Sequence, residues 1–170
     1  TMGTRIVVMK DGIVQQVDTP QALYDSPINM FVAGFIGSPQ MNFIEAELIR
    51  SDEGLSLGFG SQKIVLPEGK AKNVDEKYIG KKVIMGIRPE NLHDDEAHIA
   101  TMPNCVINAK VDITELMGAE TYLYLDVEGK QVTARVNTRS TAKAGDSIKI
   151  ALDANKIHLF DKDTELAILN

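Results

Sequence analysis

The feature that most restricts the fold is a succession of short β-rich runs, separated by turns, that fills the chain from Met41 onward. Strands spaced at roughly 8–12 residues are typical of antiparallel barrels and sandwiches, whereas a parallel α/β sheet needs a helix between successive strands. We therefore predict a mainly β fold. The expected strands span residues 42–50, 55–59, 63–66, 82–88, 105–116, 121–127, 131–136, 148–152 and 156–160.

The segments between these strands are expected to form turns and loops. A short helical turn is expected within residues 71–78, and polar loops are expected at 93–103 and 138–146. The alternation of apolar and polar side chains is blurred in residues 122–127, which indicates that some strands are covered on both faces.

The first 40 residues have a different pattern. The pair Asp11-Gly12 separates two β-rich runs, and both of its residues tolerate the positive φ angles of a hairpin turn. Thr19-Pro20 then matches the cap and the first position of a short helix. Gly37-Ser38-Pro39 reads as a linker. We therefore divide the chain into a tail, residues 1–40, and a β-domain, residues 41–170.

A second short helix is expected after Asn29, and it carries an apolar stripe. Phe31, Val32, Phe35 and Ile36 lie on one side of a helical turn. The stripe is either local core or a surface that needs a partner. In the second case residues 1–37 would dock on the β-domain, exchange between copies or be poorly ordered.

Composition limits the possible partners. The chain has 170 residues and a formal net charge of −6, so it lacks the basic footprint that a nucleic acid requires. Cys105 is the single cysteine, which fits a reducing compartment, and no apolar run approaches the ~18 residues of a membrane span. We expect a cytoplasmic protein.

The sequence contains none of the familiar catalytic motifs, including the phosphate-binding loop, the hydrolase nucleophile elbow and the zinc-protease helix. The stretch from His93 to His98 is the most metal-like, with two imidazoles and three carboxylates, but a solvated acidic loop is the favoured interpretation. Cys105 is expected to be a buried, unreactive thiol, and His158 is expected to face solvent or a partner.

Four stretches carry a family resemblance. The runs from Arg5 to Pro27 and from Phe31 to Asn42 resemble the end of the nucleotide-binding domain of maltose-type ABC importer ATPases. Asp18 stands where that family usually has glycine. The pentapeptide Gly86-Ile-Arg-Pro-Glu90 and the later stretch Glu115 to Glu120 resemble signatures of the family's regulatory domain.

The resemblance implies an OB-type barrel, the transport-associated OB domain, preceded by the hairpin and helices that end a nucleotide-binding domain. It also implies that the catalytic elements precede this region, so no catalytic, cofactor-binding or metal residue is carried over. ATP and Mg²⁺ are expected only in a longer parent, an ATP-hydrolysing subunit at the inner face of the membrane. The expected partners are a second copy, the ATPase core, the permease subunits and a regulatory protein.

Six residues are candidates for regulatory or dimer contacts, and a purely structural role for them stays open. They are Arg88, Pro89, Glu90, Glu115, Gly118 and Glu120. The leading functional hypothesis is a regulatory and dimerising domain of a carbohydrate importer's ATPase. An oxyanion-binding OB module of an importer for another solute is the alternative. A nucleic-acid-binding OB fold rests only on Tyr122 and Tyr124, which share a strand face.

Overall fold

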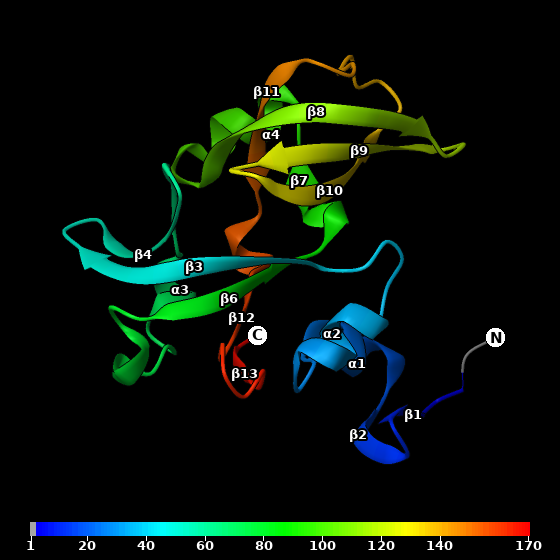
Figure 1. Ribbon diagram of the computed structural model, residues 1–170, viewed down its shortest axis with the longest axis vertical. Coiled ribbons are helices and arrows are strands. Elements are labelled where there is room, and N and C mark those ends of the chain that lie inside the picture. The colour runs from blue at the N-terminus through cyan, green and yellow to red at the C-terminus, as the bar shows by residue number, and fades with distance from the viewer. Residues whose placement is uncertain (1–2) are drawn as a thin grey trace.

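Two antiparallel β-sheets face each other across one hydrophobic core in the computed structural model, which describes residues 3–170 (Figure 1). The larger sheet has the strand order β13-β12-β6-β3-β4-β5 and the smaller one the order β10-β9-β8-β11-β7. The larger sheet consists of β3 (Asn42–Ser51), β4 (Gly54–Phe59), β5 (Gln62–Val65), β6 (Lys82–Ile87), β12 (His158–Phe160) and β13 (Ala167–Leu169). The smaller sheet consists of β7 (Leu92–His93), β8 (Val106–Leu116), β9 (Glu120–Val127), β10 (Lys130–Asn137) and β11 (Ser147–Leu152).

Side-chain amides join the two sheets where their edges meet. The Asn42 amide donates to the Thr133 carbonyl and accepts from its N–H, at 2.9 Å each. The Gln62 amide makes the same pair of bonds with the backbone of Asn108, at 3.2 Å each. These contacts bring β3 near β10 and β5 near β8. The result is a nearly closed barrel, and the predicted OB-type fold is confirmed.

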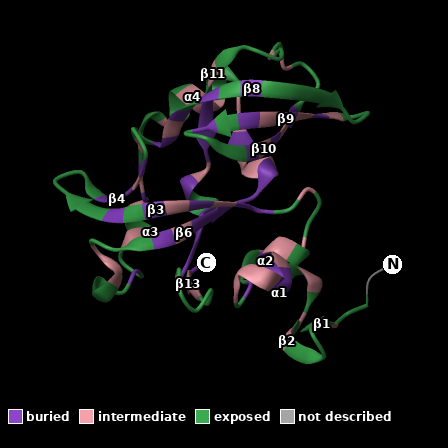
Figure 2. Cartoon of the chain, viewed as in Figure 1, coloured by how far each residue is buried: buried purple, intermediate pink, exposed green. Residues whose placement is uncertain are grey.

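The burial pattern of the strands follows from this closure (Figure 2). In β9 every second residue is buried, with Leu123, Leu125 and Val127 at 1% exposure or less. Tyr122 and Tyr124 on the opposite face are partly exposed. The prediction of a strand covered on both faces was therefore wrong, because this sheet has one core face and one outer face.

Short helices occupy the connections. They are α3 (Glu68–Ala71), η1 (Glu76–Tyr78), η2 (Pro89–Asn91), α4 (Glu96–Thr101), η3 (Pro103–Cys105) and η4 (Ala154–Lys156). The polar loop expected at 93–103 thus contains a helix, which begins where the Asp95 carboxylate accepts a bond from the His98 N–H at 3.1 Å. None of the helices among residues 3–170 has the length and apolar character needed to cross a bilayer.

The tail folds as its sequence predicts. It contains β1 (Ile6–Lys10), β2 (Ile13–Asp18), α1 (Pro20–Asp25) and α2 (Met30–Phe35). Asp11 and Gly12 have φ angles of 51° and 78°, as the turn between β1 and β2 requires. The Thr19 hydroxyl and the Asn29 amide oxygen each accept a backbone N–H at the start of a helix, at 3.1 and 2.9 Å.

The tail docks on the β-domain, which is one of the three outcomes predicted for it. The N–H of Met30 donates to the Glu165 carbonyl at 3.0 Å, and the N–H of Ala167 donates to Ile28 at 2.8 Å. The residues of the apolar stripe have different environments. Val32 is fully buried in the tail, whereas Phe35 is 63% exposed. Thr1 and Met2 lie outside the described residues.

Candidate functional site

A buried arginine joins the tail to the β-domain. Arg88 follows the end of β6 and is only 1% exposed. Its Nη1 donates to the Ile36 carbonyl at 2.6 Å and to the Ala33 carbonyl at 3.4 Å, and its Nη2 donates to the Tyr24 carbonyl at 2.8 Å. One guanidinium therefore satisfies carbonyls at the ends of both tail helices, α1 and α2, which would otherwise lack partners.

Tyr24 makes two further contacts with the same motif. The Arg88 guanidinium carbon lies 4.0 Å from the centre of the Tyr24 ring, a cation–π arrangement. The Tyr24 hydroxyl donates a short hydrogen bond to Glu90. Burial, followed by this bond and the negative charge of Glu90, raises the pKa of Tyr24 to about 12. Pro89 begins the 3-10 turn η2 between the two charged residues, so both face the tail.

The network continues into the second sheet. Arg135 on β10 lies 3.9 Å from the Glu90 carboxylate, and its Nε lies 3.4 Å from Glu120 at the start of β9. Of the six predicted positions, the structure thus brings Arg88, Pro89, Glu90 and Glu120 together. These groups connect the tail to both sheets.

Two glycines make room for this junction. A Cβ atom on Gly86 would lie 2.6 Å from the Met41 sulfur and 2.9 Å from the Phe160 ring. At Gly37, φ is 107° and a Cβ atom would lie 3.0 Å from Nη1 of Arg88. The linker can therefore pass close to the guanidinium only with glycine at that position.

His158 also belongs to the junction, in contrast to the prediction that it would face solvent or a partner. It is 6% exposed, and its Nδ1 lies 2.9 Å from the Asn170 amide oxygen. Asn170 in turn donates to the Pro27 carbonyl at 3.2 Å. Burial lowers the pKa of His158 to about 4, and the nearby positive charges of Lys70 and Arg88 act in the same direction.

The remaining two candidates, Glu115 and Gly118, lie at the tip of the β8–β9 hairpin. Glu115 accepts a hydrogen bond from the Tyr124 hydroxyl at 3.1 Å, and Gly118 has a φ of 76°, as its predicted role in a turn requires. Between them Leu116 is 78% and Met117 47% exposed. The hairpin extends beyond the rest of its sheet (Figure 1). Its apolar tip is thus available for contact.

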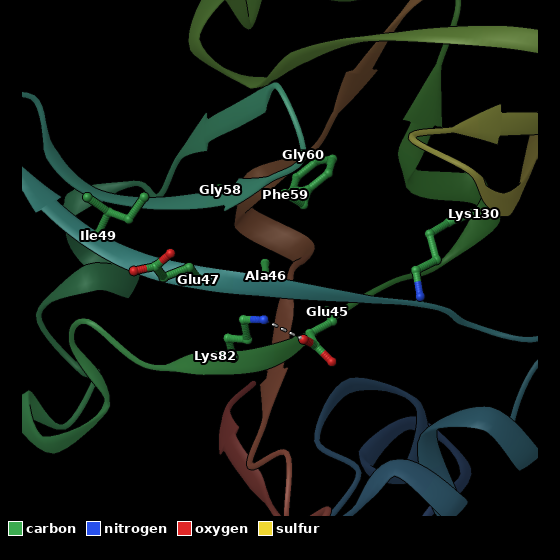
Figure 3. A pocket seen from close by; sticks show the side chains of 9 residues that line it. All are labelled: Glu45, Ala46, Glu47, Ile49, Gly58, Phe59, Gly60, Lys82 and Lys130. Atoms are coloured by element: carbon green, nitrogen blue, oxygen red, sulfur yellow. Dashed lines mark ion pairs between the residues drawn. The ribbon is translucent and has the colours of Figure 1, made fainter.

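A hollow between β3 and β4 has no evident chemistry (Figure 3). Two carboxylates line it, Glu45 and Glu47, and Glu45 is paired with Lys82 at 3.5 Å and with Lys162 at 3.2 Å. Its other walls include Phe59, Ile49 and glycine backbone, and its lining has no hydroxyl, thiol or imidazole. Cys105 lies elsewhere and is buried, which raises the pKa of its thiol and agrees with the expected unreactive role.

Tyr24 and Arg135 were not identified as members of the junction from the sequence. Tyr24 and its partner Glu90 are separated by 66 positions in the chain, and no local pattern connects them. Arg135 lies outside all the motifs that were identified from the sequence. Alternation within β10 places it on the outer face beside β9, and this signal was available in the sequence.

Comparison with known families agrees with this architecture. A family model described as the MalK OB fold domain matches residues 37–92, and one described as the TOBE domain matches residues 85–160. Residues 37–160 therefore match a MalK-type OB fold domain followed by a TOBE domain. The resemblance inferred from the sequence is thereby confirmed, and the Arg88 junction lies where the two matched regions overlap.

Two relatives of this chain are named import ATP-binding proteins. The chain is 46% identical over 169 residues to the oligosaccharides import ATP-binding protein MsmX of Bacillus subtilis. The matched region covers 99% of this chain and 45% of that protein. The chain is 40% identical over 170 residues to the trehalose/maltose import ATP-binding protein MalK of Thermococcus litoralis, covering 99% of this chain and again 45% of the relative. The chain thus spans less than half the length of these relatives.

A solved structure of the cytoplasmic molybdate-binding protein ModG, with molybdate bound, shares the fold. The TM-score is 0.54 at 18% identity, and the match covers 69% of this chain and 94% of that chain. At this identity the likeness concerns the fold alone.

Proposed function

We propose that this chain is the regulatory and dimerising region of an ATPase subunit that drives carbohydrate uptake through an ABC importer. The observation that carries the proposal is the Arg88 junction, which holds the tail firmly on the β-domain while leaving the far side of the tail apolar and exposed. The relatives MsmX, an oligosaccharides import protein, and MalK, a trehalose/maltose import protein, support a carbohydrate as the cargo.

The exposed side of the tail is a face of the β1–β2 hairpin. Val7 lies opposite Val17 and Met9 opposite Val14, and all four side chains are 39–52% exposed. Cross-strand apolar pairs of this kind ordinarily lie against a neighbouring layer. We assign that layer to the ATPase core of a longer parent, which would hold ATP, Mg²⁺ and the catalytic residues.

The two regions on either side of the proposed domain boundary have different roles. Residues 1–40 would end the nucleotide-binding domain, and residues 41–170 would form the regulatory domain. Because Arg88 fixes one part to the other, a movement of the ATPase core would be transmitted to the β-domain as a rigid rotation. The parent would be cytoplasmic and bound peripherally to the membrane through the permease subunits.

The tip of the β8–β9 hairpin is the proposed contact with a second copy. Leu116 and Met117 form an apolar tip between Glu115 and Glu120, and burying it against a partner would remove this apolar area from water. A contact between regulatory domains would keep two ATPase cores at high effective concentration while they open and close. A regulatory protein could act by altering this contact.

The proposal is tested in the parent. A version truncated before Asn42 is expected to bind ATP but to dimerise poorly and to support little sugar uptake. A second version, Leu116→Asp with the β-domain intact, is expected to lose dimer stability while it keeps ATP binding. If both versions of the parent dimerise and support sugar uptake as the unchanged parent does, the proposal is wrong.

A further inference from the structure

Two imidazoles and a carboxylate converge on the outer side of the smaller sheet. His93 ends β7, and Asp95 and His98 lie at the start of α4. One potential ligand atom from each of the three residues lies within 4.8 Å of the other two. We propose that His93, Asp95 and His98 form a binding site for a divalent first-row transition-metal ion, with Zn²⁺ as its representative.

The ligand chemistry favours this class of ion. Imidazole nitrogen and carboxylate oxygen are the donors that Zn²⁺ and its neighbours bind, at about 2.0–2.2 Å. Nδ1 of His98 lies 2.7 and 2.8 Å from the two Asp95 oxygens. Two metal–ligand bonds of this length that meet at roughly a right angle place their ligand atoms about 3 Å apart. One ion can therefore bind both His98 Nδ1 and an Asp95 oxygen after the two atoms move apart slightly. Three protein ligands leave at least one position for water or another ligand.

Helix capping explains only part of this geometry. Asp95 accepts the His98 N–H as an N-cap, and a bond to the His98 ring could accompany that role. The cap does not require His93. Yet the His93 ring lies parallel to the His98 ring, with centroids 3.8 Å apart and an angle of 9° between the planes. The second imidazole thus supplies an independent donor beside the cap. Because an imidazole nitrogen binds a metal in the plane of its ring, one of the two parallel rings must rotate before both can bind the same ion.

Rigid elements position the three groups. His93 is paired with Ala151 of β11, so its backbone is part of the smaller sheet. Asp95 is held by its capping bond. The surrounding hollow contains Glu96 and also Arg139, so its charge is mixed. Selectivity must therefore come from the donors, and Mg²⁺ and Ca²⁺, which prefer oxygen ligands, should bind much more weakly.

The first measurement is calorimetric titration of the chain, free of any polyhistidine tag, with ZnCl₂. We expect one saturable site, little heat from MgCl₂ or CaCl₂, and a rise in melting temperature with zinc concentration. His93→Asn and His98→Asn should each weaken zinc binding by about 100-fold or more, since loss of even an outer partner of a metal site costs about 10–100-fold.

Three further variants separate a metal site from a local hydrogen-bond network. Asp95→Asn keeps a good N-cap but removes a charged ligand, so it should weaken zinc binding with little loss of helix. Glu96→Gln and Cys105→Ser are matched controls that should bind zinc as the unchanged chain does. In NMR spectra, zinc should shift the imidazole signals of His93 and His98 but not those of buried His158. Equal affinity in His93→Asn, or equal loss in Glu96→Gln, would overturn the proposal.

Discussion

The two motifs that the sequence marked as contact sites have opposite environments. Arg88 in the first is 1% exposed and bonded to three backbone carbonyls of the tail, whereas Leu116 in the second is 78% exposed. Each motif contains two charged residues, Arg88 and Glu90 in the first and Glu115 and Glu120 in the second, so charge alone does not distinguish an internal joint from an outer surface. The difference lies in the partners that the rest of the chain supplies.

The physical reason is the desolvation of the arginine. Burial of a guanidinium is costly unless it is hydrogen-bonded, and the ends of the two tail helices offer carbonyls to Nη1 and Nη2 of Arg88. Its Nε is buried without a hydrogen-bond partner among the described residues. The tip of the β8–β9 hairpin has no such cover within the described residues. The first motif therefore stabilises the fold, and the second is left for association.

The largest expected effect is that of Arg88→Met. Removing the guanidinium leaves several carbonyls without a donor, so the free energy of unfolding should fall by about 3 kcal/mol or more. Urea unfolding of the variant and of the unchanged chain measures this difference in the free energy of unfolding. The control is Arg50→Met, which breaks an exposed pair with Glu76 and should cost less than about 1 kcal/mol. Equal costs would contradict the assignment of Arg88 as the joint.

The pH dependence of stability tests the same junction through His158. Its pKa is about 4 in the folded chain and about 6.5 when unfolded, so between these values the unfolded state binds more protons. Stability should be full above pH 6.5 and should fall by up to about 3 kcal/mol as the pH drops towards 4. His158→Gln should remove this part of the slope in pH-dependent unfolding. An unchanged slope would show that His158 does not titrate in this way.

A smaller effect compares two tyrosines, one in each region. Tyr24→Phe removes the bond to Glu90 and should cost about 1 kcal/mol, since its ring keeps the contact with Arg88. Tyr124→Phe removes a similar bond to Glu115 at the exposed hairpin and should change stability by less than about 0.5 kcal/mol. Thermal unfolding of the two variants gives the comparison. The reverse order of costs would contradict it.

The smallest expected change in stability is at the hairpin tip. Leu116 is mostly exposed, so Leu116→Asp should change the unfolding free energy of the monomer by less than about 0.5 kcal/mol. Denaturant unfolding at low protein concentration isolates this effect from association. A larger loss would show that Leu116 is part of the folded core.

Local signals predicted most of the fold. The β1–β2 turn, the helix caps at Thr19 and Asn29 and the main strands all depend on neighbours in sequence. The helix α4 was missed because it is a single short element whose signal, the Asp95 cap, lies in a run of charges. The strand β13 was missed because its pairing with β12 follows a turn that gives no strand signal.

The junction could be predicted only in part, because its contacts join distant segments. The Gly86 to Glu90 pentapeptide was recognised, but its partner Tyr24 and the burial of His158 depend on how the tail packs. Alternation in the strand predicted His158 to be exposed. The short edge β13 and the contact of Asn170 with the tail cover it instead.

Sedimentation of the chain over a range of concentrations tests the central claim most directly, namely that the junction is internal while the hairpin tip binds a second copy. The unchanged chain is expected to form a dimer as concentration rises, and Leu116→Asp is expected to stay monomeric with normal stability. Ile49→Ser, which alters an exposed apolar residue on the other sheet, should dimerise normally. A chain that stays monomeric throughout, or a dimer that Leu116→Asp leaves intact, would contradict the account.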